Sequence, residues 1–284
     1  MESKMKVGIV GQGFVGSAIH VGLNDYYEIC TYDLDPELRN CDSLVEVVKN
    51  AEIIFVCLPT PMRGDGSCHI EIVEGVINDI DEMCKTNGYK NRIAIIKSTV
   101  PPGTTDRLNE SAQNITVAFS PEFLTEANSF EDFKNQTRII IGANRPASTR
   151  IKSMFRKAFP MTPIVKTSAS HAETVKYFIN CFLSTKVSFA NEMYQYCESI
   201  GVDYDKVVEY ALYDKRLGAS HFSVPGPDGD FGFGGHCFPK DLAAMIYQMQ
   251  KFDVQSTVLS ATQQKNVEVR NDKDWELMKG RAII

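Results

Sequence analysis

The feature that most constrains this chain is the alternation, over its first 167 residues, of short apolar runs with segments of helical periodicity. The apolar runs are rich in β-branched residues and bounded by turn residues, so they are predicted to be strands. They cover residues 6–10, 28–33, 52–58, 92–97, 115–120 and 137–143, with a possible last strand at 162–167. Strands that are apolar on both faces and separated by helices form a mostly parallel sheet covered by helices. Residues 1–167 are therefore predicted to form an α/β domain.

After about Thr167 the pattern changes to helices alone. Residues 170–201 keep helical periodicity for some thirty residues, and apolar side chains cover much of the circumference of this predicted helix. A helix of that length and character is expected to pack on the first domain and on a second copy of itself. We predict an all-α domain over residues 168–284 with a long central helix, and a homodimer formed through residues 172–200.

The stretch KVGIVGQGFVGSAI places three glycines, Gly11, Gly13 and Gly16, between a predicted strand and a predicted helix. This G-x-G-x-x-G spacing provides a tight turn, close backbone approach to a pyrophosphate and a helix N-terminus facing its charge. The second strand ends at Asp33, where a carboxylate can bind ribose hydroxyls and repel a 2′-phosphate. The first domain is thus predicted to be a Rossmann-like, doubly wound domain that binds NAD. Because Arg39 lies nearby in the sequence, NADP is not excluded as the cofactor. The alternative is a Rossmann-type helix start that binds no ligand.

Three pairs of polar or nucleophilic side chains are each spaced four residues apart. They are Glu122 and Glu126, Lys176 and Asn180, and Cys237 and Asp241. On a helix, residues at this spacing share a face. The second pair is therefore expected to project together from the long helix, and the third to lie together if a helix begins near Cys237. Each pair alone could be solvated charge or a packed thiol, but together, beside a dinucleotide-binding domain, they indicate a catalytic site.

Six motifs in order along the chain resemble those of the UDP-glucose/GDP-mannose dehydrogenase family, and most closely its UDP-glucose 6-dehydrogenases. They are GQGFVG, LPTP, KSTVPPGTTDRL, SPEFLTE, VKYFIN and FGFGGHCFPKD. The resemblance implies oxidation of the 6-hydroxyl of a nucleotide sugar, such as UDP-glucose, to a carboxylate by two hydride transfers to NAD. It also implies a thiohemiacetal and a thioester on Cys237.

The same resemblance assigns roles to individual residues. Lys176 and Asn180 are expected to stabilise oxygen charge as an oxyanion hole does. Thr99 and Asp241 resemble a water-positioning pair, and Glu122 resembles a general acid/base. The implied cofactor contacts are Gly11, Gly13, Phe14, Val15, Gly16, Asp33, Thr60, Ser98, Thr99, Glu126 and Lys240. The implied substrate contacts are Phe123, Leu124, Glu126, Lys176, Asn180, Arg216, Phe233 and Gly234.

Two details of the last motif and its loop follow from residue chemistry and the resemblance together. The glycines before Cys237 are expected to let the backbone lie against the sugar, and a helix N-terminus favours a thiolate. His236 is interpreted as loop filler more than as a base. Arg216 resembles an arginine that reaches the substrate site of a neighbouring subunit, with an ordinary surface arginine as the alternative.

The chain departs from the family pattern at its C-terminus, because only 47 residues follow Cys237. Full-length family members carry a third α/β domain there, so this chain resembles a short form without the C-terminal UDP-binding domain. Three interpretations stay open: a natural short form, a fragment, or an enzyme whose binding of the nucleotide sugar is weaker or supplied by a partner. Two other functions stay open: a 3-hydroxy acid dehydrogenase that uses Lys176 and Asn180, and a catalytically weak NAD-binding paralogue. Cys237 and the PEFLTE segment have no role in hydroxy acid chemistry, which favours the nucleotide-sugar function.

Composition excludes several other classes of protein. A formal net charge of −6 gives no basic footprint for nucleic acid. The N-terminal stretch is too charged for a secretion signal, and no apolar run approaches the roughly 18 residues of a membrane span. The eight scattered cysteines are expected to be reduced, in a cytoplasmic protein. No metal site is predicted, because Cys68 and His69 lack partners at zinc-like spacing.

Overall fold

The computed structural model describes residues 5–284, which form two compact units. The first unit extends to Thr60 and then from Ile70 to Lys176, and the second comprises Pro61–His69 and Tyr177–Ile284. The units divide within a long helix, nine residues beyond the predicted domain boundary at 167. Residues 1–4, part of the stretch that argued against a secretion signal, lie outside the described residues.

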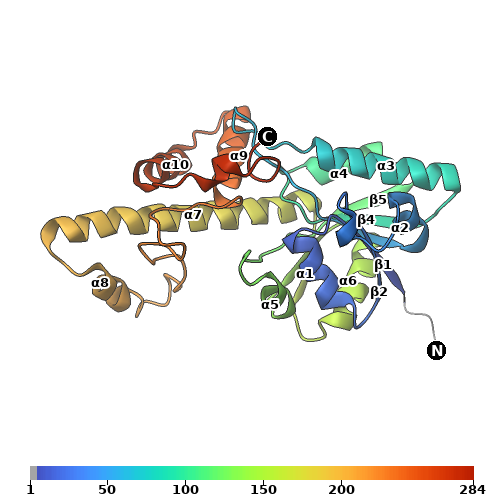
Figure 1. Cartoon of the computed structure of the whole chain (residues 1–284), viewed down its shortest axis with the longest axis horizontal. Helices are drawn as coiled ribbons and strands as arrows, with labels where there is room; N and C mark the ends of the chain where they lie inside the picture. Colours follow the sequence, from blue (N-terminus) through green and yellow to red (C-terminus); the bar gives the residue numbers. More distant parts are fainter. Residues whose placement is uncertain (1–4) are drawn as a thin grey trace. The chain divides into compact units, whose positions relative to one another are not determined.

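The first unit is built on a sheet that contains seven strands among the described residues, in the order β2-β1-β3-β4-β5-β6-β7. Figure 1 labels β1, β2, β4 and β5 of this sheet and the helices that flank it. The strands are β1 (Lys6–Val10), β2 (Glu28–Tyr32), β3 (Ile53–Val56), β4 (Arg92–Ile96), β5 (Ile115–Phe119), β6 (Ile139–Gly142) and β7 (Ile164–Thr167). Every neighbouring pair is parallel except β5 and β6. The predicted doubly wound, mostly parallel sheet is confirmed.

Helices cover both faces of this sheet because successive strand residues point to opposite sides. In β3, Ile53 and Phe55 pack with α1, α5 and α6, whereas Ile54 and Val56 pack with α2, α3 and α4. All four side chains are almost fully buried, which explains why the strands read as unbroken apolar runs. The helices are α1 (Phe14–Leu23), α2 (Leu44–Asn50), α3 (Glu71–Asn87), α4 (Thr104–Ser111), α5 (Ser129–Lys134) and α6 (Ala147–Ala158), with a 3₁₀ turn, η1 (Pro36–Leu38).

The parallel strands bring several functional residues to one edge of the sheet. Gly11, Cys57, Lys97 and Ser120 are the first residues after β1, β3, β4 and β5. In doubly wound sheets, ligands bind outside the carboxyl ends of the strands. The topology therefore gathers the glycine turn, the KST motif and the SPEFLTE motif at the edge where a ligand is expected.

The second unit is helical and includes most of the 32-residue helix α7 (Ala169–Ile200). Its other helices are α8 (Tyr204–Ala211), α9 (Phe238–Lys251), α10 (Thr257–Val269) and the 3₁₀ turn η2 (Asp274–Leu277). The segment 61–69 belongs here because Met62 bridges to Ile283. Among the described residues, none of the helices combines the length and apolarity needed to cross a membrane.

Candidate active site

The glycine turn of the first unit fits a dinucleotide pyrophosphate. Gly11 has a φ of +89°, and a Cβ there would lie 2.4 Å from the Cys57 carbonyl oxygen. A Cβ at Gly16 would lie 1.9 Å from the Gly11 carbonyl oxygen, so the turn can close onto α1 only with glycine at both positions. By contrast, a Cβ at Gly13 would meet nothing within 4 Å. The start of α1, with Phe14 and Val15 as its first residues, therefore adjoins open space in which an anion can approach the helix N-terminus.

Asp33 follows β2 directly and is tied to the same turn. Its Oδ2 accepts a hydrogen bond from the Gln12 backbone N–H at 2.6 Å, and its Oδ1 accepts one from Asp35 at 2.9 Å. A carboxylate has about four acceptor sites, so capacity for ribose hydroxyls remains. Arg39 lies over the Tyr32 ring at 5.4 Å, and its Nη1 donates to the Asp33 carbonyl at 3.4 Å. The carboxylate and a nearby guanidinium thus both adjoin the glycine turn.

The KST motif after β4 joins neighbouring loops of the first unit. The Ser98 hydroxyl donates to the Leu58 carbonyl at 2.6 Å and accepts from the Leu58 N–H at 2.9 Å. The Thr60 hydroxyl donates to the Thr99 carbonyl at 2.9 Å. Three of the predicted cofactor and catalytic residues, Thr60, Ser98 and Thr99, therefore hold the loops after β3 and β4 together.

Glu122 and Lys176 form a buried ion pair in the first unit. Lys176 Nζ lies 2.8 Å from Glu122 Oε1 and also donates to the Glu122 carbonyl at 2.9 Å. Burial alone would raise the pKa of Glu122, but the Lys176 charge and hydrogen bond, with the Leu124 N–H, hold that pKa below its ordinary value. The structure thus brings a predicted acid/base together with a predicted oxyanion donor.

Three further predicted residues lie in the same irregular segment as Glu122. Leu124 donates its N–H to Glu122 Oε2 at 2.6 Å, and the Phe123 ring lies 5.6 Å from Lys176 Nζ. Glu126 is exposed, whereas Glu122 is buried. The four-residue spacing does not unite these glutamates on one face, because residues 120–125 have no helical structure.

The second unit holds a buried polar group around Asp241. Asp241 is 1% exposed; its Oδ2 accepts from Asn180 Nδ2 at 2.6 Å, and its Oδ1 accepts from Lys240 Nζ at 2.5 Å. Burial would lower the pKa of Lys240, but the adjacent Asp241 carboxylate raises it above its ordinary value. Asn180 and Lys240 are thus both bonded to the predicted water-positioning carboxylate. Lys176 lies one turn before Asn180 on α7.

Cys237 is the N-cap residue of α9, which begins at Phe238 with Pro239 in its first turn. The Asp241 N–H donates to the Cys237 carbonyl at 3.0 Å, so the two residues lie one helical turn apart, as the spacing predicted. Cys237 is half-buried and forms no disulfide. A thiol at this position adjoins the positive end of the helix dipole, which favours a thiolate.

The glycine-rich loop before Cys237 packs on the chain itself. Asn266 Oδ1 accepts from the Phe233 N–H at 2.7 Å, and Asn266 Nδ2 donates to the Phe233 carbonyl at 2.9 Å. A Cβ at Gly232 would lie 2.3 Å from Asn266 Oδ1, and one at Gly234 would lie 2.3 Å from Arg270 Nη2. Close packing against α10 and the residue after it therefore accounts for these two glycines without a ligand.

Two other candidates lie elsewhere in the second unit. The Arg216 side chain is 88% exposed and pairs with Asp214. His69 Nδ1 lies 3.0 Å from Arg63 Nη2, and Cys68 is buried. Within residues 5–284, no group of three or more His, Cys, Asp or Glu side chains is placed to hold a metal ion.

Sequence reasoning missed three buried residues that organise the site. Glu173 is fully buried and accepts from the Gly103 N–H at 2.7 Å and the Thr105 N–H at 2.8 Å, so it caps α4. Lys97 and Asn266 hold the loops that lead to Glu122 and Cys237. Asn266 could have been identified from the sequence by its position four residues before Arg270, because the same helical spacing identified the other pairs.

Comparisons with known proteins support the family resemblance. The NAD-binding domain of the UDP-glucose/GDP-mannose dehydrogenase family matches residues 35–159, and the central domain of that family matches residues 170–268. A UDP-glucose 6-dehydrogenase of Rickettsia bellii is 36% identical over 232 residues, which are 78% of this chain and 51% of that protein. The Bacillus subtilis protein YtcA, provisionally named a UDP-glucose 6-dehydrogenase, is 31% identical over 92% of this chain and 67% of its own length.

A solved structure agrees with these sequence matches. The UDP-glucose dehydrogenase of Pyrobaculum islandicum superposes with a TM-score of 0.84 at 29% identity, over 94% of this chain and 69% of that one. The chain spans about half to two thirds of the length of these relatives. It belongs to the UDP-glucose/GDP-mannose dehydrogenase family and carries that family's NAD-binding and central domains.

Proposed function

We propose that this chain catalyses the NAD-dependent oxidation of a nucleotide sugar at carbon six, converting UDP-glucose to UDP-glucuronate. Its relatives are named for this activity, and the chain has their NAD-binding and central domains. The observation that carries the proposal is Cys237 at the start of α9, with the buried Asp241 one turn later. A thiol in that position has a role in this oxidation and none in the oxidation of a 3-hydroxy acid.

The chemistry requires removal of four electrons from one carbon. When bound, NAD accepts one hydride in each of the two oxidations. The 6-hydroxyl would lose its proton and the carbon a hydride to give an aldehyde. The Cys237 thiolate would then add to the aldehyde carbon, and the oxygen would take up a proton to give a thiohemiacetal. Loss of that hydroxyl proton and of the second hydride from the carbon would leave a thioester. Attack of water on the thioester then releases the carboxylate and returns the thiol. The covalent bond keeps the aldehyde from leaving between the two oxidations.

Several side chains would assist these steps. Lys176 and Asn180 would stabilise the negative charge that develops on oxygen as tetrahedral species form. Glu122, held ionised beside Lys176, would take the proton of the alcohol and return one during the covalent stages. Asp241 and Thr99 would position the hydrolytic water. Phe123, Leu124, Glu126, Phe233, Gly234 and, from a neighbouring subunit, Arg216 are the proposed substrate contacts.

The first unit would hold the cofactor. Gly11, Gly13 and Gly16 would receive the pyrophosphate at the start of α1, and Asp33 would bind the ribose hydroxyls. The other proposed contacts in the first unit are Phe14, Val15, Thr60, Ser98, Thr99 and Glu126. Lys240, a residue of the second unit, is also a proposed contact. The Asp33 carboxylate would repel the 2′-phosphate of NADP, so the rate of NAD reduction is expected to exceed that of NADP reduction. A preference for NADP would indicate that Arg39, rather than Asp33, determines which cofactor binds.

The proposal is tested by following NADH formation at 340 nm with the purified chain and UDP-glucose. We expect two NADH per UDP-glucuronate in the wild type, and loss of the second oxidation with NAD binding retained in Cys237→Ser. The buried Cys197→Ala serves as the matched control. Equal product formation by wild type and Cys237→Ser would refute the thioester. Activity with GDP-mannose, a UDP-N-acetyl sugar or 3-hydroxy acids in place of UDP-glucose would assign a different substrate.

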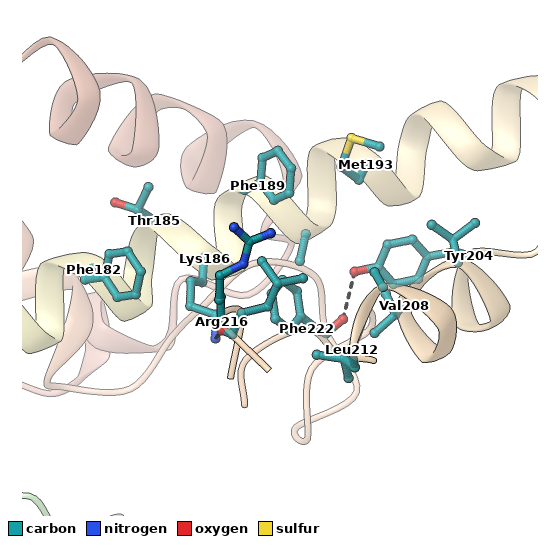
Figure 2. A pocket seen from close by; sticks show the side chains of 14 residues that line it. Phe182, Thr185, Lys186, Phe189, Met193, Tyr204, Val208, Leu212, Arg216 and Phe222 are labelled. Atoms are coloured by element: carbon teal, nitrogen blue, oxygen red, sulfur yellow. Dashed lines mark hydrogen bonds between the residues drawn. The ribbon is translucent and has the colours of Figure 1, made fainter. Parts of the chain in front are cut away.

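We also propose that the chain forms a homodimer through residues 172–200. Phe178, Phe182 and Phe189 of α7 are 71%, 55% and 58% exposed, and the first two rings stack at 6.4 Å. Phe182 and Phe189 also line an apolar groove of about 550 Å³, and Figure 2 shows them along α7 with Leu212, which follows α8. Contiguous exposed apolar surface of this kind is typical of a protein interface.

The dimer is tested by sedimentation velocity at micromolar concentration. We expect a dimer for the wild type and a monomer with unchanged circular dichroism for Phe189→Asp, because a buried carboxylate opposes association. Glu198→Gln, at an exposed position of the same helix, is the control and should remain a dimer. A monomeric wild type would contradict the proposal.

A further inference from the structure

Lys97 is a buried lysine to which no role has been assigned in the proposed reaction. It is the first residue after β4 and is 5% exposed. Its Nζ donates to the Pro121 carbonyl at 3.0 Å and lies 3.5 Å from the Ser120 hydroxyl. Burying an ammonium group is unfavourable unless hydrogen bonds and opposite charge compensate it. A lysine at this position therefore needs an explanation beyond packing.

The segment that Lys97 contacts leads directly into Glu122. The Pro121 carbonyl accepts from Lys97, and the next carbonyl, that of Glu122, accepts from Lys176. Lys176 also binds the Glu122 carboxylate, whose other oxygen accepts from the Leu124 N–H. Two ammonium groups, from the end of β4 and from α7, thus hold two consecutive peptide carbonyls in a segment without regular structure. Lys176 binds the Glu122 carboxylate directly, and Lys97 binds the carbonyl of the preceding residue.

We propose that Lys97 is a positioning residue: its ammonium holds Ser120–Glu122 in the conformation in which Glu122 meets Lys176. Loss of its proton weakens this hold and shifts the segment, because a neutral amine donates weaker hydrogen bonds than an ammonium. The catalytic consequence rests on the proposed function, because it requires Glu122 to be the acid/base. The structural consequence, a proton-dependent conformation of residues 120–124, does not.

Burial of Lys97 brings the loss of its proton close to neutral pH. The titratable groups that face it are Cys57 after β3, Glu122 after β5 and Lys176 on α7. Burial lowers the pKa of Lys97 to about 8; Glu122 opposes this shift and Lys176 adds to it. Burial raises the pKa of the Cys57 thiol to about 12, so that thiol is neutral when Lys97 titrates. A solvated lysine, in contrast, keeps its proton to about pH 10.4.

The first test is an NMR titration of the full chain with labelled lysine and backbone amides, which needs no turnover. The lysine signal lost in Lys97→Arg should titrate near pH 8, and the amides of residues 120–124 should shift with the same midpoint. In Lys97→Arg those amides should stay constant to pH 10, because arginine keeps its charge. Lys85→Arg, on the exposed face of α3, should behave as the wild type. Amides that do not follow the Lys97 midpoint, or a midpoint above pH 10, would overturn the proposal.

The second test measures NAD reduction with UDP-glucose as a function of pH. Wild-type kcat should fall above pH 8, and Lys97→Arg should keep its kcat to higher pH. Lys97→Met should lower kcat by about 10- to 100-fold, the effect of a misplaced catalytic group, with little change in KM. An inactive wild type with the expected NMR titration would refute the proposed function and leave the Lys97 inference standing. An active wild type without that titration would overturn the Lys97 inference alone.

Discussion

Asn266→Ala removes the side chain that fixes the glycine-rich loop before Cys237. Asn266 is 3% exposed and binds both the N–H and the carbonyl of Phe233. The alanine variant leaves two buried backbone groups without a partner, and each such group costs about 1–3 kcal/mol. We therefore expect the free energy of unfolding to fall by about 2–6 kcal/mol. Asn266→Asp keeps the acceptor for the Phe233 N–H but loses the donor to the Phe233 carbonyl, and it places a charge in a buried site. This variant should therefore also have a lower free energy of unfolding than the wild type.

The chain provides its own probe for this experiment. Trp275 is its one tryptophan, is buried, and lies next to Asp274, whose carboxylate accepts from the Gly235 N–H of the same loop. Urea unfolding followed by tryptophan fluorescence therefore reports on the second unit. Gln263→Ala, at an exposed position of α10, is the control and should change the midpoint little. A loss below 1 kcal/mol for Asn266→Ala, or one equal to the control, would refute the reasoning.

Three further perturbations concern the buried charges of the first unit. Lys176→Met removes the ammonium group that pairs with the buried Glu122 carboxylate, and it should lower the free energy of unfolding by about 3–5 kcal/mol. Urea unfolding followed by circular dichroism measures this change. A loss of less than 1 kcal/mol would contradict a stabilising role of the ion pair. The folded-state pKa of Glu122 is lowered, so its ionised form stabilises the fold above its ordinary pKa of 4.5, and this contribution is lost as pH falls through the folded value. Glu122→Gln should therefore show a flatter loss of stability between pH 5 and 3 than the wild type. Glu173→Ala removes the acceptor for two backbone N–H groups at the start of α4 and should cost about 2–6 kcal/mol in thermal or urea unfolding, and an unchanged midpoint would contradict that cap.

Much of the first unit could be predicted from sequence because its signals are local. Strands buried on both faces read as continuous apolar runs, and the glycine spacing lies between an apolar run and a helical pattern, the context of a dinucleotide-binding turn. The start of α9 after Cys237 was also predictable, since Pro239 suits a first helical turn and Asp241 lies one turn on. In each case the residues that determine the structure are neighbours in sequence.

The parts that escaped prediction depend on residues far apart in the chain. Glu122 and Glu126 have the same spacing as the other pairs, yet Lys97 and Lys176 hold their segment in an irregular conformation. Gly232 was expected to face a ligand, and it faces Asn266, which lies 34 residues later. No periodicity within these segments could indicate such distant partners.

The distribution of thiols makes Cys237 a natural site for selective labelling. Of the eight cysteines, six are buried, and the partly exposed Cys57 has a pKa raised to about 12 by burial of its thiol. A brief exposure to iodoacetamide should therefore alkylate Cys237 first, as peptide mass spectrometry would show. The wild-type sequence could then be labelled with a fluorophore or a spin label at the start of α9, without substitution of any other cysteine.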